Sequence, residues 1–93
     1  MPTIVRYLGY NIYIWSNESN PVESIHVHAA NTPTENADKF WLTKDGLIIP
    51  DSKNKMLSKR DTAKIVSYLS DEYIQTDIKS EWLKRFGEIK YKE

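Results

Sequence analysis

The sequence contains no cysteine, and this absence excludes disulfide bonds, thiolate metal sites and thiol redox chemistry. It also lacks any run of the roughly 18 apolar residues that a membrane span needs. The opening MPTIVRYLGYNIYIW has neither the charged start nor the continuous apolar stretch of a signal peptide. The formal net charge is zero, so overall charge favours neither nucleic acid nor an anionic membrane. We therefore expect a cytoplasmic protein with no membrane partner.

Aromatic residues, in contrast, are plentiful. They make up 12% of the 93 residues, among them three tryptophans and six tyrosines. A chain of this length buries only about 60% of the surface that it exposes when unfolded, and aromatic side chains supply large buried areas from few positions. We expect a single domain, residues 1–93, with a small core rich in aromatic residues.

Alternating side chains and turn residues predict strands in the first half of the chain. TIVRYLGYNIYIW reads as two strands joined at Gly9, and SIHVHAA, KFWLT and LIIP follow at intervals of about ten residues. The connections are short, as in hairpins, apart from a loop at 31–38. These features predict an antiparallel sheet of about four or five strands within residues 3–49.

Beyond Pro50 the hydrophobic pattern takes the period of helices. Two helices are predicted, at about 59–69 and 73–86, with Ser58 as the N-cap of the first and Gly87 as the left-handed cap of the second. The tail after Gly87 is either frayed or a short added strand. Strands followed by helices predict an α+β fold, in which both helices pack on one face of the sheet. Which face they cover stays open.

The first hairpin and the third strand suggest an interaction surface. If Ile12 and Ile14 face the helices, the bulky side chains on the other face of the sheet have no predicted element long enough to cover them. An exposed aromatic face marks an interaction surface on many small proteins. In the alternative interpretation, the 31–38 loop folds over this face or Trp15 belongs to the core. The predicted interaction residues are Tyr10, Tyr13, Trp15, His26 and His28.

The two histidines also carry an enzymatic alternative. Residues two apart on a strand point the same way, so both imidazoles could reach one divalent ion, with Glu23 as a third ligand. The same histidines with Glu23 and a phosphate-holding Arg6 would suit a histidine-based nuclease. The simpler interpretation gives the histidines no chemical role, and we expect no metal or other cofactor. The other carboxylates considered as ligands are Glu18 and Asp38.

Basic residues gather before and along the first predicted helix, in the segment 53–64. A basic patch at the start of a helix can receive phosphates. Acidic neighbours and the neutral total favour a solvated helix face instead, so a nucleic-acid partner is not expected. The residues of this weaker alternative are Lys53, Lys55, Lys59, Arg60 and Lys64.

The opening MPTIVRYLGYNIYIW, followed by SNESNPVESIHV, resembles a small bacterial family of unknown function. Its members begin Met-Pro-Thr-Ile, continue with Arg-aromatic-x-Gly, and carry an Asp-His-x-Pro-Pro-His-x-His-Val segment. GLIIP and the two closing helices, with Trp82 in the second, agree as well. The resemblance implies a toxin–antitoxin-like, phage or mobile-element setting, in which the protein is encoded beside a second small protein and binds a partner.

This chain departs from the family pattern in the histidine segment. Aligned on His26, it has Ser19 in place of the first family histidine and Val22 in place of the second proline, while His28 is additional. An activity that rests on three histidines is therefore not implied here. We predict a module that binds another small protein, and self-association into a homodimer stays open.

Overall fold

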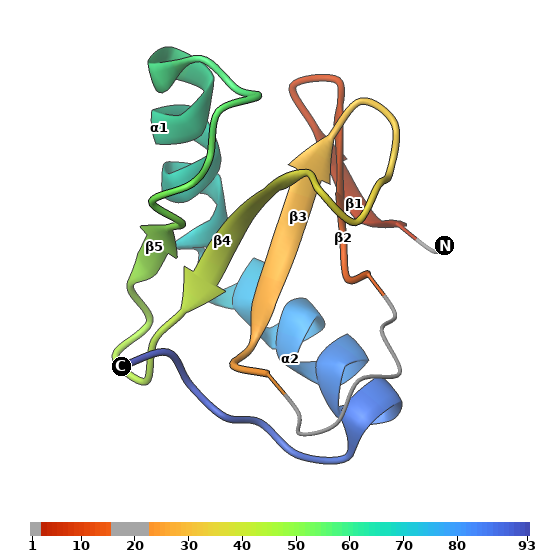
Figure 1. Cartoon of the computed structure of the whole chain (residues 1–93). Coiled ribbons are helices and arrows are strands. Elements are labelled where there is room, and N and C mark those ends of the chain that lie inside the picture. Colours follow the sequence, from red (N-terminus) through yellow and green to blue (C-terminus); the bar gives the residue numbers. More distant parts are fainter. Residues whose placement is uncertain (1–2, 16–22) are drawn as a thin grey trace.

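The structure, a computed structural model, describes residues 3–15 and 23–93, so Glu18, Ser19 and Val22 lie outside the described residues. Five strands form one antiparallel sheet in the order β1-β2-β3-β4-β5, and two helices follow (Figure 1). This confirms the predicted α+β fold. The elements are β1 (Thr3–Tyr7), β2 (Tyr10–Tyr13), β3 (His26–Ala30), β4 (Asp38–Leu42), β5 (Ile48–Pro50), α1 (Lys59–Leu69) and α2 (Glu72–Phe86).

The connection between β1 and β2 is a tight two-residue turn. Leu8 and Gly9 both have positive φ, at 55° and 80°, and Tyr7 pairs with Tyr10 across the turn. Two positive φ angles are the mark of a type I′ turn, whose twist matches that of the flanking strands. Glycine adopts this backbone conformation freely, whereas a leucine is sterically strained in it.

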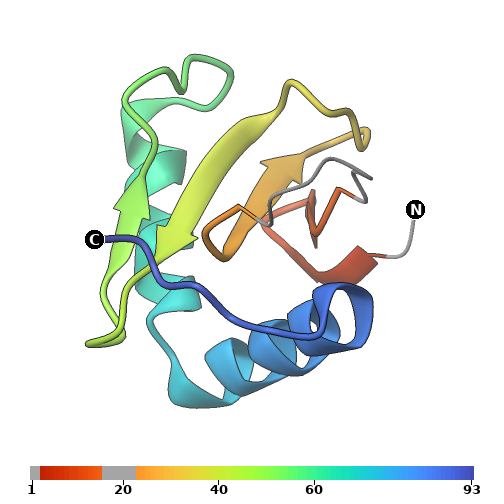
Figure 2. The ribbon, with the colours of Figure 1, turned by 60° about the horizontal axis from the view of Figure 1, so that its bottom comes forward.

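Both helices cover the same face of the sheet (Figures 1 and 2). This face consists of apolar residues that lie directly opposite each other on neighbouring strands. Directly paired residues point to the same side of the sheet. Ile12 of β2 and Ile14, which follows β2, are buried on this face. They therefore face the helices, which is the arrangement that the predicted interaction surface assumed. The buried residues of this main core are Ile12, Ile14, Ile25, Val27, Ala29, Phe40, Leu42, Ile48, Ile65, Leu69, Ile78 and Trp82.

Side chains and one glycine cap both helices. Ser58 Oγ accepts a hydrogen bond from the Asp61 amide at 3.0 Å, and the Asp71 carboxylate accepts one from the Tyr73 amide at 2.8 Å. Gly87 ends α2 with φ at 78° and donates its N–H to the Leu83 carbonyl. The predicted caps Ser58 and Gly87 are therefore confirmed. No helix in the described parts of the chain is long and apolar enough to cross a membrane.

The C-terminal segment after α2 returns to the sheet. Ile25 donates its N–H to the Lys90 carbonyl at 2.8 Å, and Lys92 donates to the Leu42 carbonyl at 2.9 Å. Thr43 and Lys92 form a parallel bridge. The tail is therefore held in place by backbone hydrogen bonds, as in the added-strand alternative, and it brings Lys92 next to β4.

Candidate functional site

His26 and His28 lie on the face of the sheet opposite the main core, which we call the helix-free face. At the edge of this face the His26 ring also contacts Trp82 of α2, with the ring centres 5.4 Å apart. His28 stands between Tyr13 of β2 and Lys39 of β4. Both imidazoles are buried, with only 6% and 2% of their surfaces exposed. The expectation that these histidines form part of an exposed surface is therefore wrong.

Each histidine is held by a backbone carbonyl. Nδ1 of His26 lies 2.8 Å from the Ser24 oxygen, and Nδ1 of His28 lies 3.1 Å from the Ala37 oxygen. Because a carbonyl only accepts, each Nδ1 carries the proton and Nε2 carries the lone pair. Burial lowers the pKa of His26, and it lowers the pKa of His28 to about 4. Both rings are therefore neutral at neutral pH, and His28 titrates far below the range that suits acid–base catalysis there.

The residues of the metal and nuclease alternatives are mostly apart. Glu23 approaches His26 Nε2 at 3.8 Å, but no described residue completes a metal site with them. In residues 3–15 and 23–93, no group of three or more His, Cys, Asp or Glu side chains could hold a metal ion. Arg6 lies on β1, two strands away from β3, and its side chain is exposed. Asp38, the other described carboxylate considered as a ligand, is engaged elsewhere.

Tyr10 lies on the other face of the sheet, so its grouping with Tyr13 and Trp15 was wrong. Its hydroxyl donates a 2.7 Å hydrogen bond to the Asp61 carboxylate on α1, and its ring packs against the main core. The physical reason is the strand period of two, which places Tyr10 on the same side as Ile12. Tyr10 therefore ties β2 to α1.

Tyr13 is fully buried although no helix covers its face. Its hydroxyl donates to the Thr34 carbonyl at 2.7 Å and accepts from the Thr34 amide at 2.8 Å. Together with Ala30 and Ala37 it forms a second, smaller core, against which the half-buried Trp15 packs. The loop that contains Thr34 thus folds over this part of the sheet. The expected exposure of Tyr13 is wrong for this reason, and the alternative of a covering loop is confirmed.

Trp41 of β4 is a partly exposed ring on the helix-free face. The ammonium groups of Lys39 and Lys92 lie 5.5 Å and 4.9 Å from its ring centre, within the range of cation–π attraction. The indole N–H donates to the Asp51 carboxylate at 3.1 Å, and the His26 ring lies behind it at 4.7 Å. We call Trp41, Lys39 and Lys92 the Trp41 surface.

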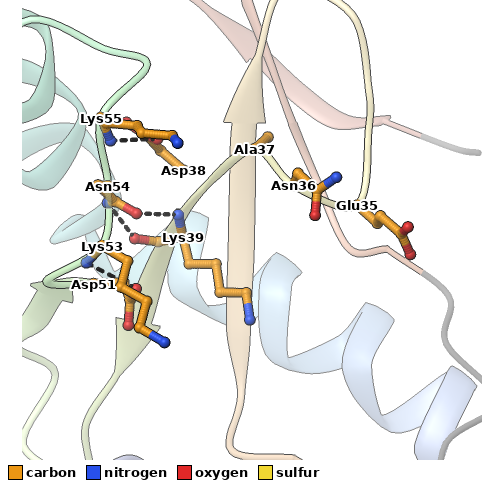
Figure 3. A pocket seen from close by; sticks show the side chains of 9 residues that line it. All are labelled: Glu35, Asn36, Ala37, Asp38, Lys39, Asp51, Lys53, Asn54 and Lys55. Carbon is orange, nitrogen blue, oxygen red and sulfur yellow. Dashed lines mark hydrogen bonds between the residues drawn. The ribbon is translucent and has the colours of Figure 1, made fainter.

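A polar cleft of about 460 Å³ adjoins this surface (Figure 3). One wall is the loop at 35–37 and the other is the segment at 51–55, while the Lys39 side chain extends between them across β3. Three lysines and three acidic residues line the cleft, and Lys53, Lys55 and Glu35 are the exposed ones among them. The lining residues are Glu35, Asn36, Ala37, Asp38, Lys39, Asp51, Lys53, Asn54 and Lys55.

Asp38 and Asn54 fix the wall formed by the segment before α1. The buried Asp38 carboxylate accepts hydrogen bonds from three successive backbone amides, those of Lys55, Met56 and Leu57, at 3.0 to 3.2 Å. The Asn54 amide group pairs with both backbone groups of Lys39 at 2.8 Å. Neither role was predicted, because each joins β4 to a segment more than ten residues away in sequence.

A comparison with protein families finds a match, which covers most of the chain. The sequence profile of a domain of unknown function, DUF4160, matches residues 9–82. The chain belongs to the DUF4160 family. Searches of curated proteins and of solved structures find no match for it. The predicted membership of a small family of unknown function is therefore confirmed, and the histidine motif and the genomic setting stay predictions.

The basic segment of this DUF4160 domain is divided between two places. Lys53 and Lys55 line the polar cleft. Lys59 lines a mainly apolar groove of about 480 Å³ between β5 and α1, while Arg60 and Lys64 lie on α1. The groove and the cleft share Asp51 and Asn54 in their linings, and the nucleic-acid surface at 53–64 stays a prediction.

The importance of Trp41 could have been read in part from the sequence. In KFWLT, strand alternation puts Lys39 and Trp41 on one face and the apolar Phe40 and Leu42 on the other. The contribution of Lys92 had no such signal, because it depends on the return of the C-terminal segment to β4.

Proposed function

We propose that this DUF4160 protein acts by binding another protein, and that the Trp41 surface is its docking site. The partner presents an acidic segment. In keeping with the family resemblance, the setting is a toxin–antitoxin-like pair or a phage or mobile-element system, and the partner is a small protein encoded nearby.

One observation carries the proposal: the partly exposed Trp41 ring has the ammonium groups of Lys39 and Lys92 5.5 Å and 4.9 Å from its centre. Both helices lie on the other face of the sheet (Figure 1). Tryptophan is enriched among the residues that dominate binding energy at interfaces. Charged residues around it guide association and select partners of opposite sign. A carboxylate of the partner would take the ammonium groups of Lys39 and Lys92, while an apolar neighbour covers the ring.

The chemistry of the histidines supports binding over catalysis. His28 is neutral, buried and bonded to the backbone, and the Glu23 carboxylate lies 3.8 Å from Nε2 of His26. A nuclease would need a group that titrates near neutrality and a cation beside it to hold the phosphate. No observation on the described residues favours that alternative.

Charge reversal on the Trp41 surface tests the proposal. Calorimetric titration with the small protein encoded beside this one should show that Lys39→Glu and Lys92→Glu each weaken binding about tenfold, which equals about 1.4 kcal/mol. Lys59→Glu on α1 is the matched control, since it changes the net charge equally, and it should alter affinity less than about threefold. Unchanged affinity in both test variants would overturn the docking site.

Nucleic acid is the competing outcome of the same experiment. Binding of a labelled single-stranded RNA that weakens steeply with salt, and that Lys59→Glu reduces as strongly as Lys39→Glu, would replace the protein partner with a nucleic acid held by the segment 53–64. If the protein does not bind this RNA, the result supports a protein partner over a nucleic acid.

A further inference from the structure

β1 is an edge strand whose outer side pairs with no described residue. Tyr7 and Tyr10 flank the two-residue turn and pair with each other, so strand alternation directs the backbone N–H and C=O of Arg6 outward. At the opposite edge, β5 has only three residues and ends in a proline, which offers no N–H. A β-bulge between Thr3 and Val5 interrupts the register of β1, but Val5, Arg6 and Tyr7 pair regularly with β2. This regular part makes the edge of β1 the better template for an added strand.

A cleft of about 300 Å³ beside this edge is lined by residues of β1 and α2. In the part of the chain that the structure describes, no hydrogen bond or ion pair engages Asp77, and Glu81 contacts only the exposed Lys84 of its own helix, at 3.5 Å. Successive turns of α2 thus offer carboxylates along the side that faces β1. The lining residues are Thr3, Ile4, Asp77, Ser80, Glu81 and Lys84.

We propose that the outer edge of β1 binds an extended segment of another protein by strand addition, and that a Lys or Arg side chain of this segment enters the cleft. An added strand lies about 4.8 Å beyond β1, and every second side chain points toward the helix side. Backbone hydrogen bonds would supply affinity, and the carboxylates of Asp77 and Glu81 would select the basic residue.

A second copy of this chain fits the cleft less well. In antiparallel pairing of two β1 strands, each copy would bring its helix-side residues Val5 and Tyr7 to the other's α2, and neither carries a charge. Arg6, the only charged residue of β1, points to the helix-free face because it pairs with Asn11. The charge of the cleft therefore favours a different chain.

This site is independent of the Trp41 surface and takes the opposite charge. Its probe is a capped peptide of sequence Thr-Val-Lys-Val-Lys-Val-Thr, compared with the same peptide carrying glutamate in place of both lysines. On ¹⁵N-labelled full-length protein, the lysine peptide should shift the amides of Thr3–Tyr7 and bind at least tenfold more tightly than the glutamate peptide. No shift in β1 at millimolar lysine peptide would overturn the site.

Two variants separate the two parts of the proposal. Asp77→Asn with Glu81→Gln should remove at least three quarters of the preference for lysine, whereas the control pair Asp45→Asn with Glu88→Gln, equal in charge change and exposed, should leave it intact. Arg6→Pro should abolish binding of both peptides, because it removes an outward N–H from an edge strand that tolerates proline. An unchanged preference in the first pair, or dimerisation of the protein through β1, would overturn the proposal.

Discussion

Nδ1 of His28 donates a hydrogen bond to the carbonyl oxygen of Ala37, 3.1 Å away, and so joins β3 to the loop that covers Tyr13. The Tyr13 and His28 rings stack at 5.4 Å beneath that loop. A histidine in this position favours its neutral form, because burial removes water from the charged ring and this cost exceeds the favourable effects of the Ala37 carbonyl and Glu23. The protein therefore has a pH-dependent element at the centre of the helix-free face.

Stability should fall on acidification between about pH 6.5 and pH 4. The pKa of His28 is lowered from 6.5 to about 4 by burial, so in this window the unfolded chain binds a proton that the folded protein does not. Stability is then fully present above pH 6.5 and is lost as the pH falls, by about 3 kcal/mol in total. Urea unfolding at successive pH values measures this loss.

His28→Asn is the matched control for that experiment. The asparagine amide can donate to the Ala37 carbonyl in place of Nδ1 and does not titrate. Its slope of stability against pH between 6.5 and 5 should be shallower than that of the wild type, with the lowered pKa of His26 accounting for what remains. Equal slopes in the two proteins would show that His28 is charged or exposed in solution.

Asp38→Asn should destabilise the fold by about 2 to 3 kcal/mol. The carboxylate receives three backbone amides, and an asparagine side chain would turn its own N–H groups toward some of these donors. Hydrogen exchange of the amides of Lys55, Met56 and Leu57 should accelerate along with this loss. Asp45→Asn, in the exposed turn between β4 and β5, serves as the control and should change stability by less than about 0.5 kcal/mol.

Leu8→Asn should stabilise the protein by about 1 kcal/mol. Leu8 has φ at 55° and is 46% exposed, so the change relieves strain in a type I′ turn without removing a core side chain. Gly9→Ala, at φ 80°, should have the opposite effect. Thermal unfolding of the two variants checks both signs, and a destabilised Leu8→Asn would mean that the leucine side chain makes a stabilising contact.

Tyr10→Phe should cost about 1 kcal/mol of stability, because it removes the hydrogen bond to Asp61 and leaves the ring packed against the core. A double-mutant cycle with Asp61→Ala isolates this contact from other effects of either change. An interaction energy of zero would mean that β2 and α1 are held together by packing alone.

Local patterns in the sequence predicted most of the fold. Ser58 and Gly87 marked helix ends, and alternation separated Ile12 and Ile14 from Tyr13. The misplaced Tyr10 was an error of application, since the same alternation puts it with Ile12. Helix ends and the alternation of strand side chains depend on the backbone preferences of neighbouring residues, so the sequence shows them directly.

The site was harder to predict because contacts of strand residues with a loop and a tail far away in sequence create it. No sequence pattern in the 31–38 loop predicts that the backbone N–H and C=O of Thr34 both form hydrogen bonds with the Tyr13 hydroxyl. Likewise, the contact of Lys92 with Trp41 depends on where the tail crosses the sheet. Such contacts decide which parts of a sheet face are buried, and the sequence alone therefore overestimated the exposed surface.

The most direct test of the proposed function is chemical-shift mapping on ¹⁵N-labelled protein with the small protein encoded beside it. The account predicts the largest changes at Lys39, Lys92 and the indole N–H of Trp41, with the amides of α1 little affected. Changes confined to the segment 53–64, or no change at saturating partner, would contradict it.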